Sequence, residues 1–200
     1  MSDIQYGLIS RIDSNAIEKT IDLIANDVPR ETINYCEIGL YHGATTKGVK
    51  EYLDSKGLKY NLTGIDNFKD KEPLVHLPKE VKLIEGSSIE VYNQLEDNSQ
   101  DLIMVDSNHS FAYVVADYYC YRKKVKIGGF MAWHDAAPQS QFKSWQRMGS
   151  ESDADTYVAV LKGLKEIGLL DNKVEGWVKV FHEWDKVDEG GGIVIFRRYK

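Results

Sequence analysis

Hydrophobic positions along this chain fall into two alternating kinds of segment. Short and almost continuous apolar runs recur, and these are typical of strands buried on both faces of a parallel sheet. Between them lie segments with an apolar residue every three or four positions, which is the pattern of an amphipathic helix. The predicted strands cover residues 33–39, 58–66, 81–86, 101–106 and 128–134, and the predicted helices cover 14–28, 45–57, 87–98, 110–125 and 153–168. Such an alternation indicates an α/β fold.

The end of the chain has a different pattern. Residues 177–184 and 191–199 read as a hairpin around a charged, glycine-rich turn. The expected fold is therefore a Rossmann-like, doubly wound and mostly parallel seven-stranded sheet with a C-terminal antiparallel hairpin. Residues 1–200 are expected to form a single domain. It would include an N-terminal helical segment (1–30) and a polar, lid-like insertion (136–153) that is longer than most connections.

Two of the predicted strands run into clusters of acidic and histidine side chains. DLIMVD leads into Asp106-Ser107-Asn108-His109, and GGFMAWHD ends in His134-Asp135. A strand, a helix and a second strand form a βαβ unit, so both clusters should lie at the same ligand-binding edge of the sheet. On neighbouring strands the two aspartates would be about 5 Å apart. They would repel each other by roughly 3 kcal/mol at an effective dielectric constant near 20. A cation, a shared proton or a basic substrate is needed to neutralise them.

A glycine-containing turn, EIGLYHGATT, follows the first strand. Gly39 and Gly43 let the backbone pass close to a ligand, and Thr45 and Thr46 begin the next helix. The spacing is GxxxG and not the GxGxxG of dinucleotide-binding folds. A carboxylate at Glu37 disfavours phosphate and favours a ligand with a cationic group. The alternative is a structural turn that has a glutamate by chance.

The second and third strands also end in polar residues. Asp66 lies at the tip of the second strand, where nucleoside-binding Rossmann-like folds hold a ribose diol. It is alternatively a solvated acid at a strand end. Ser87 and Ser88 follow the third strand, where they either contact an adenine or cap a helix.

Composition narrows the range of partners. The chain has 200 residues, 42% of them hydrophobic and 28% charged, with a net charge of −6. This charge argues against a general nucleic-acid or anionic-membrane binder, and no apolar stretch approaches the roughly 20 residues of a membrane span. The first residues do not have the pattern of a secretory signal. Cys36 and Cys120 have neither metal-site nor disulfide spacing, so a reducing, cytoplasmic setting is expected.

The motifs at the strand ends resemble those of class I S-adenosylmethionine-dependent methyltransferases. The segments that carry the resemblance are EIGLYHGATT, GID, EGSS, DLIMVDSNHSF and GGFMAWHDA, within residues 30–136. The similarity is greatest to the macrocin O-methyltransferase and cephalosporin-hydroxylase-like group of small-molecule O-methyltransferases. In that group a D-x-x-H segment after the fourth strand and an HD pair after the fifth recur. Ser107 and Asn108 depart from the group, which often has glycine and an acid there.

The resemblance implies roles for individual residues. Glu37, Gly39 and Gly43 would surround the methionine part of the cofactor, and Asp66 would hold the ribose. Asp106 and His109 are the catalytic candidates, with His109 as general base. The candidate cofactor-binding residues are Glu37, Gly39, Tyr41, Gly43, Thr45, Thr46, Asp66, Asn67, Ser87, Ser88 and Asp106. The candidate metal ligands are Asp106, His134 and Asp135.

These roles lead to a hypothesis for the chemistry. The cofactor would be S-adenosyl-L-methionine, and the acceptor a small hydroxylated molecule such as a sugar, a polyol or a catechol. Carboxylate ligands suit Mg²⁺, with Ca²⁺ or Mn²⁺ as alternatives, and the cation would lower the pKa of the acceptor hydroxyl. An alternative is a protein that binds S-adenosylmethionine or a nucleoside without methyl transfer. The glycine spacing makes an oxidoreductase the weaker reading. No nucleic-acid or membrane partner is expected, and association with further copies of the chain stays open.

Other residues with candidate chemistry are expected to have ordinary structural roles. His42 and His76 read as surface residues, His182 as a solvent-facing side chain of the hairpin, and Trp133 as a core residue. Within the insertion, three large side chains would form either a lid over the acceptor or a partner contact. They are Phe142, Trp145 and Met148.

Overall fold

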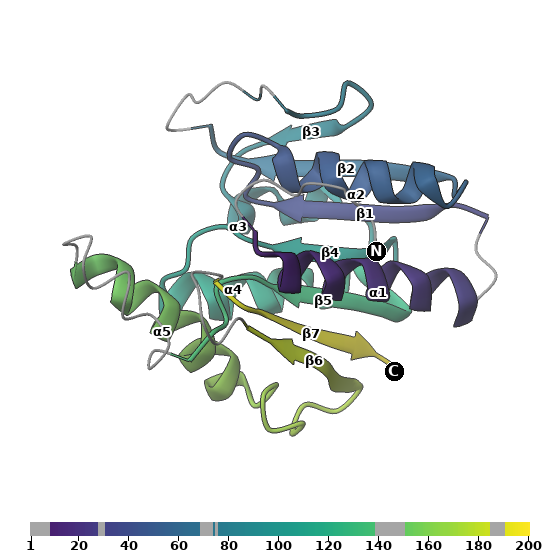
Figure 1. Cartoon of the computed structure of the whole chain (residues 1–200). Helices are drawn as coiled ribbons and strands as arrows, with labels where there is room; N and C mark the ends of the chain where they lie inside the picture. The colour runs from purple at the N-terminus through teal and green to yellow at the C-terminus, as the bar shows by residue number, and fades with distance from the viewer. Residues whose placement is uncertain (1–8, 28–30, 69–73, 75, 139–150, 185–190) are drawn as a thin grey trace.

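The computed structural model describes residues 9–27, 31–68, 74, 76–138, 151–184 and 191–200. A seven-stranded sheet runs through the middle of the molecule, with helices on both faces (Figure 1). Its strands are β1 (Ile33–Ile38), β2 (Tyr60–Asp66), β3 (Lys82–Glu85), β4 (Gln100–Val105), β5 (Val125–Trp133), β6 (Trp177–Glu183) and β7 (Ile193–Arg198). The helices are α1 (Arg11–Asp27), α2 (Ala44–Ser55), α3 (Ser88–Val91), α4 (Phe111–Tyr121) and α5 (Glu151–Ile167), with a 3-10 turn η1 (Tyr92–Gln94).

The strand order confirms the predicted fold class. The order is β3-β2-β1-β4-β5-β7-β6. The first five strands are parallel, and β7 is antiparallel to both of its neighbours, β5 and β6. The direction in which successive strands are added reverses between β1 and β4, which are paired with each other. Ligands of open α/β sheets bind beside such a reversal, at the carboxyl ends of the strands.

Hydrophobic side chains on both faces of the sheet form the core. Successive residues of a strand point to opposite faces, so Leu102 and Met104 of β4 pack in the layer that contains α1 and α2. Ile103 and Val105 pack in the other layer, with side chains of α3, α4 and α5. All four are buried. The continuous apolar runs of the sequence therefore correspond to strands covered on both sides, as predicted.

Helix α1 begins earlier than the sequence pattern predicted. Ser10 and Asp13 form a reciprocal cap: the Ser10 hydroxyl donates to Asp13 Oδ2 (2.8 Å), and the Asp13 amide donates to Ser10 Oγ (3.1 Å). Ser14, the first residue of the predicted helix 14–28, instead lies within the first turns of α1, where its hydroxyl donates to the carbonyl of Arg11. A capping box places the helix start at Ser10.

Two other boundaries differ from the prediction. The predicted helix 87–98 is only a single turn, Ser88–Val91, followed by the 3-10 turn. Strand β5 starts at Val125 rather than at residue 128, and its first residue pairs with Gln100. Pairing with β4 thus begins β5 at Val125, which the predicted helix 110–125 had included as its last residue.

The predictions for individual side chains have different outcomes. Trp133 is a core residue, as expected. The prediction that His182 faces solvent is wrong, since its Nε2 lies 2.9 Å from the carbonyl oxygen of Ala136 and the ring is partly buried. Burial lowers the pKa of His182. Phe142, Trp145 and Met148 lie outside the described residues.

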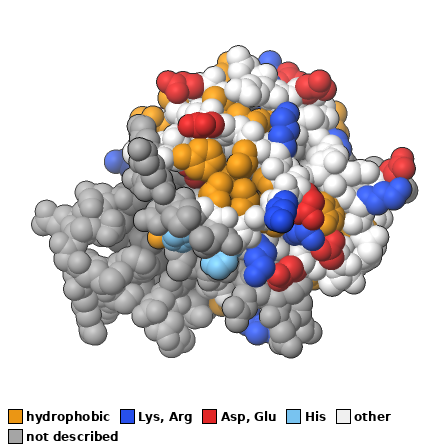
Figure 2. Space-filling view, turned by 90° about the horizontal axis from the view of Figure 1, so that it is seen from above, with side chains coloured by type: hydrophobic (Ala, Val, Ile, Leu, Met, Phe, Trp, Pro, Cys, Tyr) orange, Lys and Arg blue, Asp and Glu red, His pale blue; other side chains and the backbone are white. Residues whose placement is uncertain are grey.

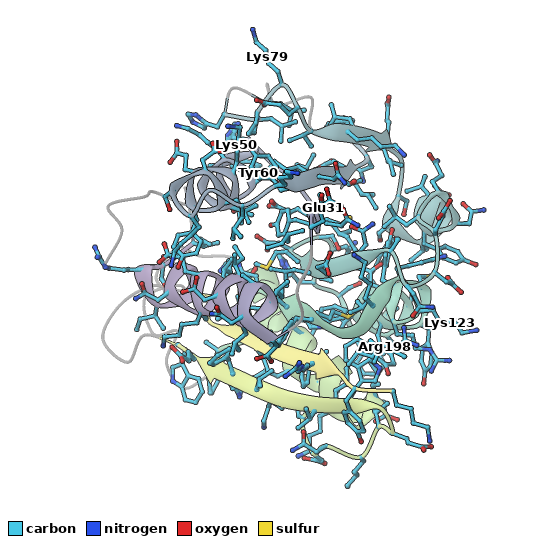
Figure 3. All side chains as sticks on the ribbon, turned by 90° about the vertical axis from the view of Figure 1, so that its right-hand side faces the viewer. Glu31, Lys50, Tyr60, Lys79, Lys123 and Arg198 are labelled. Atoms are coloured by element: carbon cyan, nitrogen blue, oxygen red, sulfur yellow. The ribbon has the colours of Figure 1, made fainter. Side chains whose placement is uncertain are left out.

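Polar contacts at the amino ends of the parallel strands are structural. Figure 3 views this end of the sheet and labels Arg198, Lys50 and Tyr60. Arg198 Nη1 donates to the carbonyl of Val125 at 2.6 Å, which joins the end of β7 to the start of β5. Asp54 accepts hydrogen bonds of 2.7 Å from both Lys50 and Tyr60, which joins α2 to β2. These side chains fasten element ends together, opposite the edge where a ligand would bind.

The surface seen from above carries acidic, basic and hydrophobic side chains together. In Figure 2, acidic and basic side chains are interspersed around a small group of hydrophobic ones. Within the described part of the chain, no helix combines the length and the hydrophobicity that crossing a membrane requires.

A buried acid on α4 ties this helix to two loops at the carboxyl edge of the sheet. Asp117 is fully buried. It accepts a hydrogen bond of 2.6 Å from the Ser88 hydroxyl, after β3, and one of 3.0 Å from the Ser107 hydroxyl, after β4. Burial raises the pKa of Asp117 to about 6, although the two hydrogen bonds oppose that shift.

The raised pKa predicts a pH dependence of stability. Between about pH 4 and pH 6, folded Asp117 holds a proton that the unfolded chain has released, so this group makes stability fall as pH rises. Asp117→Asn keeps hydrogen-bonding capacity and removes the ionisation. Relative to the wild type, the variant should gain up to about 2–3 kcal/mol between pH 4 and pH 7, as measured by urea unfolding. Glu90→Gln, at an exposed acid on α3, should show no such gain, and an equal gain there would contradict the assignment.

Candidate active site

A cavity of about 340 Å³ lies at the carboxyl ends of the first four strands. Its walls come from the loops that follow β1, β2, β3 and β4, which is the edge where the sequence predicted a site. Seven of the predicted cofactor-binding residues line it, and they are Gly39, Tyr41, Asp66, Asn67, Ser87, Ser88 and Asp106. Hydrophobic lining comes from Ile38, Ile65, Phe68 and Tyr113.

The turn after β1 needs glycine at its first position. Gly39 has φ +87, and a Cβ atom there would lie 2.1 Å from the carbonyl oxygen of Asp106 on the neighbouring strand. Any side chain would thus push the ends of β1 and β4 apart. The backbone of Gly39 therefore lies close to the end of β4, and Gly39 also lines the cavity. Its close approach to a ligand stays a prediction.

Asp66 joins the ends of β1 and β2. Its Oδ2 accepts the backbone N–H of Leu40 at 2.8 Å and that of Tyr41 at 3.3 Å, and its Oδ1 accepts the N–H of Phe68 at 2.8 Å. The reading of Asp66 as a merely solvated acid is therefore wrong. A carboxylate oxygen has more than one lone pair, so these contacts leave acceptor capacity on the wall of the cavity.

Glu37 lies behind the cavity rather than on its wall. It is 1% exposed, and both the Tyr35 hydroxyl (3.1 Å) and the Thr46 hydroxyl donate to its Oε2. Burial raises the pKa of Glu37 to about 8, and the negative charge of Asp106 adds to the shift, whereas the hydrogen bond from Thr46 opposes it. The group is thus mainly protonated at neutral pH until a positive charge comes near.

The remaining predicted residues of the glycine turn lie at the start of α2 and do not line the cavity. Gly43 is the N-cap of α2, with φ +80, and Leu77 packs against it. Thr45 and Thr46 are buried in the first turn of α2. None of these three residues is on the wall of the cavity, and Thr46 acts on the site through Glu37. At the start of α3, the Ser88 hydroxyl donates to Asp117 instead of capping that helix.

The three predicted metal ligands lie together beside the cavity. One atom each of Asp106, His134 and Asp135 can be chosen so that all lie within 4.8 Å of one another. His134 Nδ1 is 3.3 Å from Asp106 Oδ1 and 3.3 Å from Asp135 Oδ1. Two cis ligands of an octahedral Mg²⁺ site, with bonds of 2.0–2.1 Å, are about 3 Å apart. The donor set and its spacing therefore fit a divalent cation.

His109 bridges the two aspartates. Its Nε2 lies 2.8 Å from Asp135 Oδ2 and 3.3 Å from Asp106 Oδ1. Burial disfavours a charged imidazole, but the two carboxylates prevail and raise the pKa of His109 to about 9. In the same way they raise the pKa of His134 well above its usual value. Burial alone would raise the pKa of Asp106, yet the two histidines hold it below its usual range.

Sequence reasoning missed two residues that shape this cluster. Asp13, at the start of α1, lies with its Oδ2 3.3 Å from His134 Nε2. Gly191, before β7, lies where a Cβ would be 1.9 Å from Asp135 Oδ1. Asp135 itself has φ +55, which is uncommon for a residue other than glycine. The Ser-x-x-Asp capping pattern could have marked Asp13 as a helix start, but nothing local connects either residue with the site.

Solved structures confirm the fold. A protein from Staphylococcus aureus, proposed to be a caffeoyl-CoA O-methyltransferase, matches with a TM-score of 0.67 and 16% identity over 96% of this chain and 86% of its own. An O-methyltransferase from Bacillus cereus in complex with SAH matches with a TM-score of 0.59 and 12% identity over 92% and 88%. The methyltransferase MycE of mycinamycin biosynthesis, in complex with Mg and SAH, matches with a TM-score of 0.56 and 15% identity over 90% and 48%.

Sequence comparison identifies the family. No curated protein matches this chain. A family model described as a methyltransferase domain matches residues 36–136, which is 101 of the 200 residues. The matched segment holds the glycine turn, Asp66 and both acidic clusters. The chain therefore belongs to the methyltransferase domain family, the S-adenosylmethionine-dependent class of enzyme that its motifs predicted.

Proposed function

We propose that this protein transfers a methyl group from S-adenosylmethionine to a hydroxyl oxygen of a small hydroxylated molecule, such as a sugar, a polyol or a catechol, with the help of a divalent cation. One observation carries the proposal: Asp106 lines the cavity and also belongs to the cluster that fits a cation. A donor in the cavity and an acceptor at the cation would then meet at one residue. Methyl transfer depends mainly on such alignment, because the sulfonium already activates the methyl group.

The walls of the cavity suit the proposed cofactor. Its volume of about 340 Å³ lies within the usual range of small-molecule sites. We assign the ribose to Asp66, with Asn67 beside it, and the methionine part to the turn at Gly39 and Tyr41. The adenine would lie near Ser87 and Ser88. Gly43, Thr45 and Thr46 would shape the turn from behind.

The cation would be held by Asp106, His134 and Asp135. Two carboxylates and one imidazole leave further coordination positions for water or for a chelating diol. A bound cation would supply charge that stabilises the oxyanion of the acceptor. The Mg and SAH complex of MycE, which shares this fold, supports such an arrangement.

His109 is the proposed general base. It lies beside both aspartates, and its side chain is 23% exposed, so an acceptor can reach it. Accepting a proton requires the neutral imidazole. The two aspartates disfavour that form until their charge is shared with a cation or a substrate.

The first prediction of this proposal concerns protons released on binding. If the positive charge of the cofactor comes near Glu37, the pKa of that carboxyl should fall from about 8, and the protein should release up to roughly one proton at pH 7. Calorimetry of S-adenosylmethionine and S-adenosylhomocysteine in two buffers with different ionisation enthalpies measures this release.

Glu37→Gln is the matched variant, because an amide can still accept from Thr46 and Tyr35 but does not titrate. It should bind without the proton release. Wild-type binding that releases no proton would contradict the role of Glu37, and no binding below millimolar concentration would contradict the cofactor.

The second prediction concerns the cation. At a hundredfold excess over Kd, Mg²⁺ or Mn²⁺ should stabilise the wild type by about 2.7 kcal/mol, which raises Tm by roughly 5–10 °C. Asp135→Asn should abolish this shift, whereas Asp171→Asn, at an exposed acid after α5, should keep it. An equal shift in both variants would mean that the ion binds elsewhere.

The third prediction concerns activity. His109→Gln should lower kcat by about 10²- to 10⁴-fold, the usual contribution of a general base, with little change in the affinity for S-adenosylhomocysteine. His76→Gln, at an exposed loop position, should have wild-type activity. Methyl transfer to a panel of sugars, polyols and catechols is the measurement. A wild type that binds cofactor and cation but methylates no member of the panel would favour the binding-protein alternative.

A further inference from the structure

Helix α1 contributes a buried acid to the cation cluster. Asp13 is 0% exposed and lies in the first turn of α1, whereas His134 lies at the end of β5. The two side chains meet at 3.3 Å between Asp13 Oδ2 and His134 Nε2, although 121 positions separate them in the sequence. The other ring nitrogen of His134, Nδ1, faces Asp106 and Asp135.

The contacts of Asp13 Oδ2 identify it as an acceptor. The backbone N–H and the hydroxyl of Ser10 both point to this oxygen, at 3.2 Å and 2.8 Å. Because Oδ2 accepts from both donors, the hydrogen bond with His134 has Nε2 as its donor. An imidazole that binds a cation carries one proton and donates one lone pair, so a proton held at Nε2 leaves Nδ1 as the nitrogen available to a cation. Nδ1 is also the nitrogen that lies 3.3 Å from Asp106 and from Asp135, the other two proposed ligands.

Stability alone does not account for a carboxylate in this position. Asp13 Oδ1 is buried and has no hydrogen-bond partner among the described residues. A buried carboxylate with one unsatisfied oxygen costs free energy. The helix cap that Asp13 forms with Ser10 requires only a polar side chain at a helix start, and such caps are normally solvated. The burial is explained if Asp13 acts on His134.

We propose that Asp13 is a positioning residue that keeps the proton of His134 on Nε2, so that Nδ1 binds the divalent cation together with Asp106 and Asp135. This inference rests on the proposed cation site and extends it to a helix outside the matched methyltransferase segment. A carboxylate that orients the imidazole and increases its basicity is a recurring device of metal sites, and its removal typically costs 10- to 100-fold in metal affinity. The effect should be larger for cations that favour imidazole, such as Co²⁺, than for Mg²⁺, which favours oxygen.

Titration of the purified full-length chain with Co²⁺ and with Mg²⁺ tests this inference. Asp13→Ala should lower Co²⁺ affinity by 10- to 100-fold and Mg²⁺ affinity by a smaller factor. Asp13→Asn, whose amide oxygen is a weaker acceptor, should fall between Asp13→Ala and the wild type, and it serves if the alanine variant does not fold. In proton NMR of the Co²⁺ form, the wild type should show a hyperfine-shifted, solvent-exchangeable proton from His134 Nε2–H. That signal should be absent in His134→Ala and broadened by exchange in Asp13→Ala.

Ser10→Ala separates this role from helix capping. It removes the hydroxyl of the cap and leaves Asp13 beside His134, so it should lower Tm but change Co²⁺ affinity by less than threefold. A loss of Co²⁺ affinity in Ser10→Ala equal to that in Asp13→Ala would overturn the inference. Wild-type Co²⁺ binding that neither Asp13 variant weakens would overturn it as well and leave the cation site intact. A wild type that binds neither cation would overturn the cation site and this inference together, while methyl transfer would still be tested by cofactor binding.

Discussion

Negative charge gathers where β4 and β5 end, and the arrangement of this edge depends on how that charge is compensated. Asp106 and Asp135 come from neighbouring strands, and Asp13 comes from α1. At 5 Å and an effective dielectric constant near 20, each pair of carboxylates would repel by roughly 3 kcal/mol. Two imidazoles separate them: His134 lies between Asp13 and Asp106, and His109 lies between Asp106 and Asp135. Charges of opposite sign thus alternate from the first helix to the edge of the sheet. A cation bound among them would take over part of the compensation that the imidazoles now supply.

The same edge divides into two halves that meet at the junction of β1 and β4. On the β1 and β2 side, backbone groups and Asp66 form a concave wall. On the β4 and β5 side, ionisable side chains dominate. The halves approach closely because Gly39 has no side chain to hold the two strands apart. Asp106 belongs to both halves, so its carboxylate is where a bound nucleoside and a bound cation would affect each other. A parallel sheet with its reversal at this point makes that meeting a consequence of topology.

Sequence patterns predicted those parts of the structure that depend on neighbours along the chain. Strand and helix periods gave the sheet, and the βαβ rule brought Asp106 and Asp135 together. Asp13 could not be found in this way, because its partner His134 lies 121 positions away. Asp117 could not be predicted for another reason. It lies among the apolar positions of α4, and only the tertiary structure shows that the hydroxyls of Ser88 and Ser107 donate hydrogen bonds to it. Ser10 and Ser14 are both plausible caps in sequence, and the Ser10–Asp13 hydrogen bonds decide between them.

Ser107 and Asn108 depart from the related methyltransferases at the loop that carries His109, and the structure gives both a local role. The Ser107 hydroxyl donates to Asp117, which fastens the end of β4 to α4. Asn108 Oδ1 accepts the N–H of Ser110 at 2.9 Å, and this contact forms the turn that leads into α4. These contacts hold the loop in a conformation in which His109 lies beside both aspartates. The two departures from the family pattern are therefore compatible with the place proposed for the general base, because neither Ser107 nor Asn108 takes up the side-chain atoms that His109 contacts.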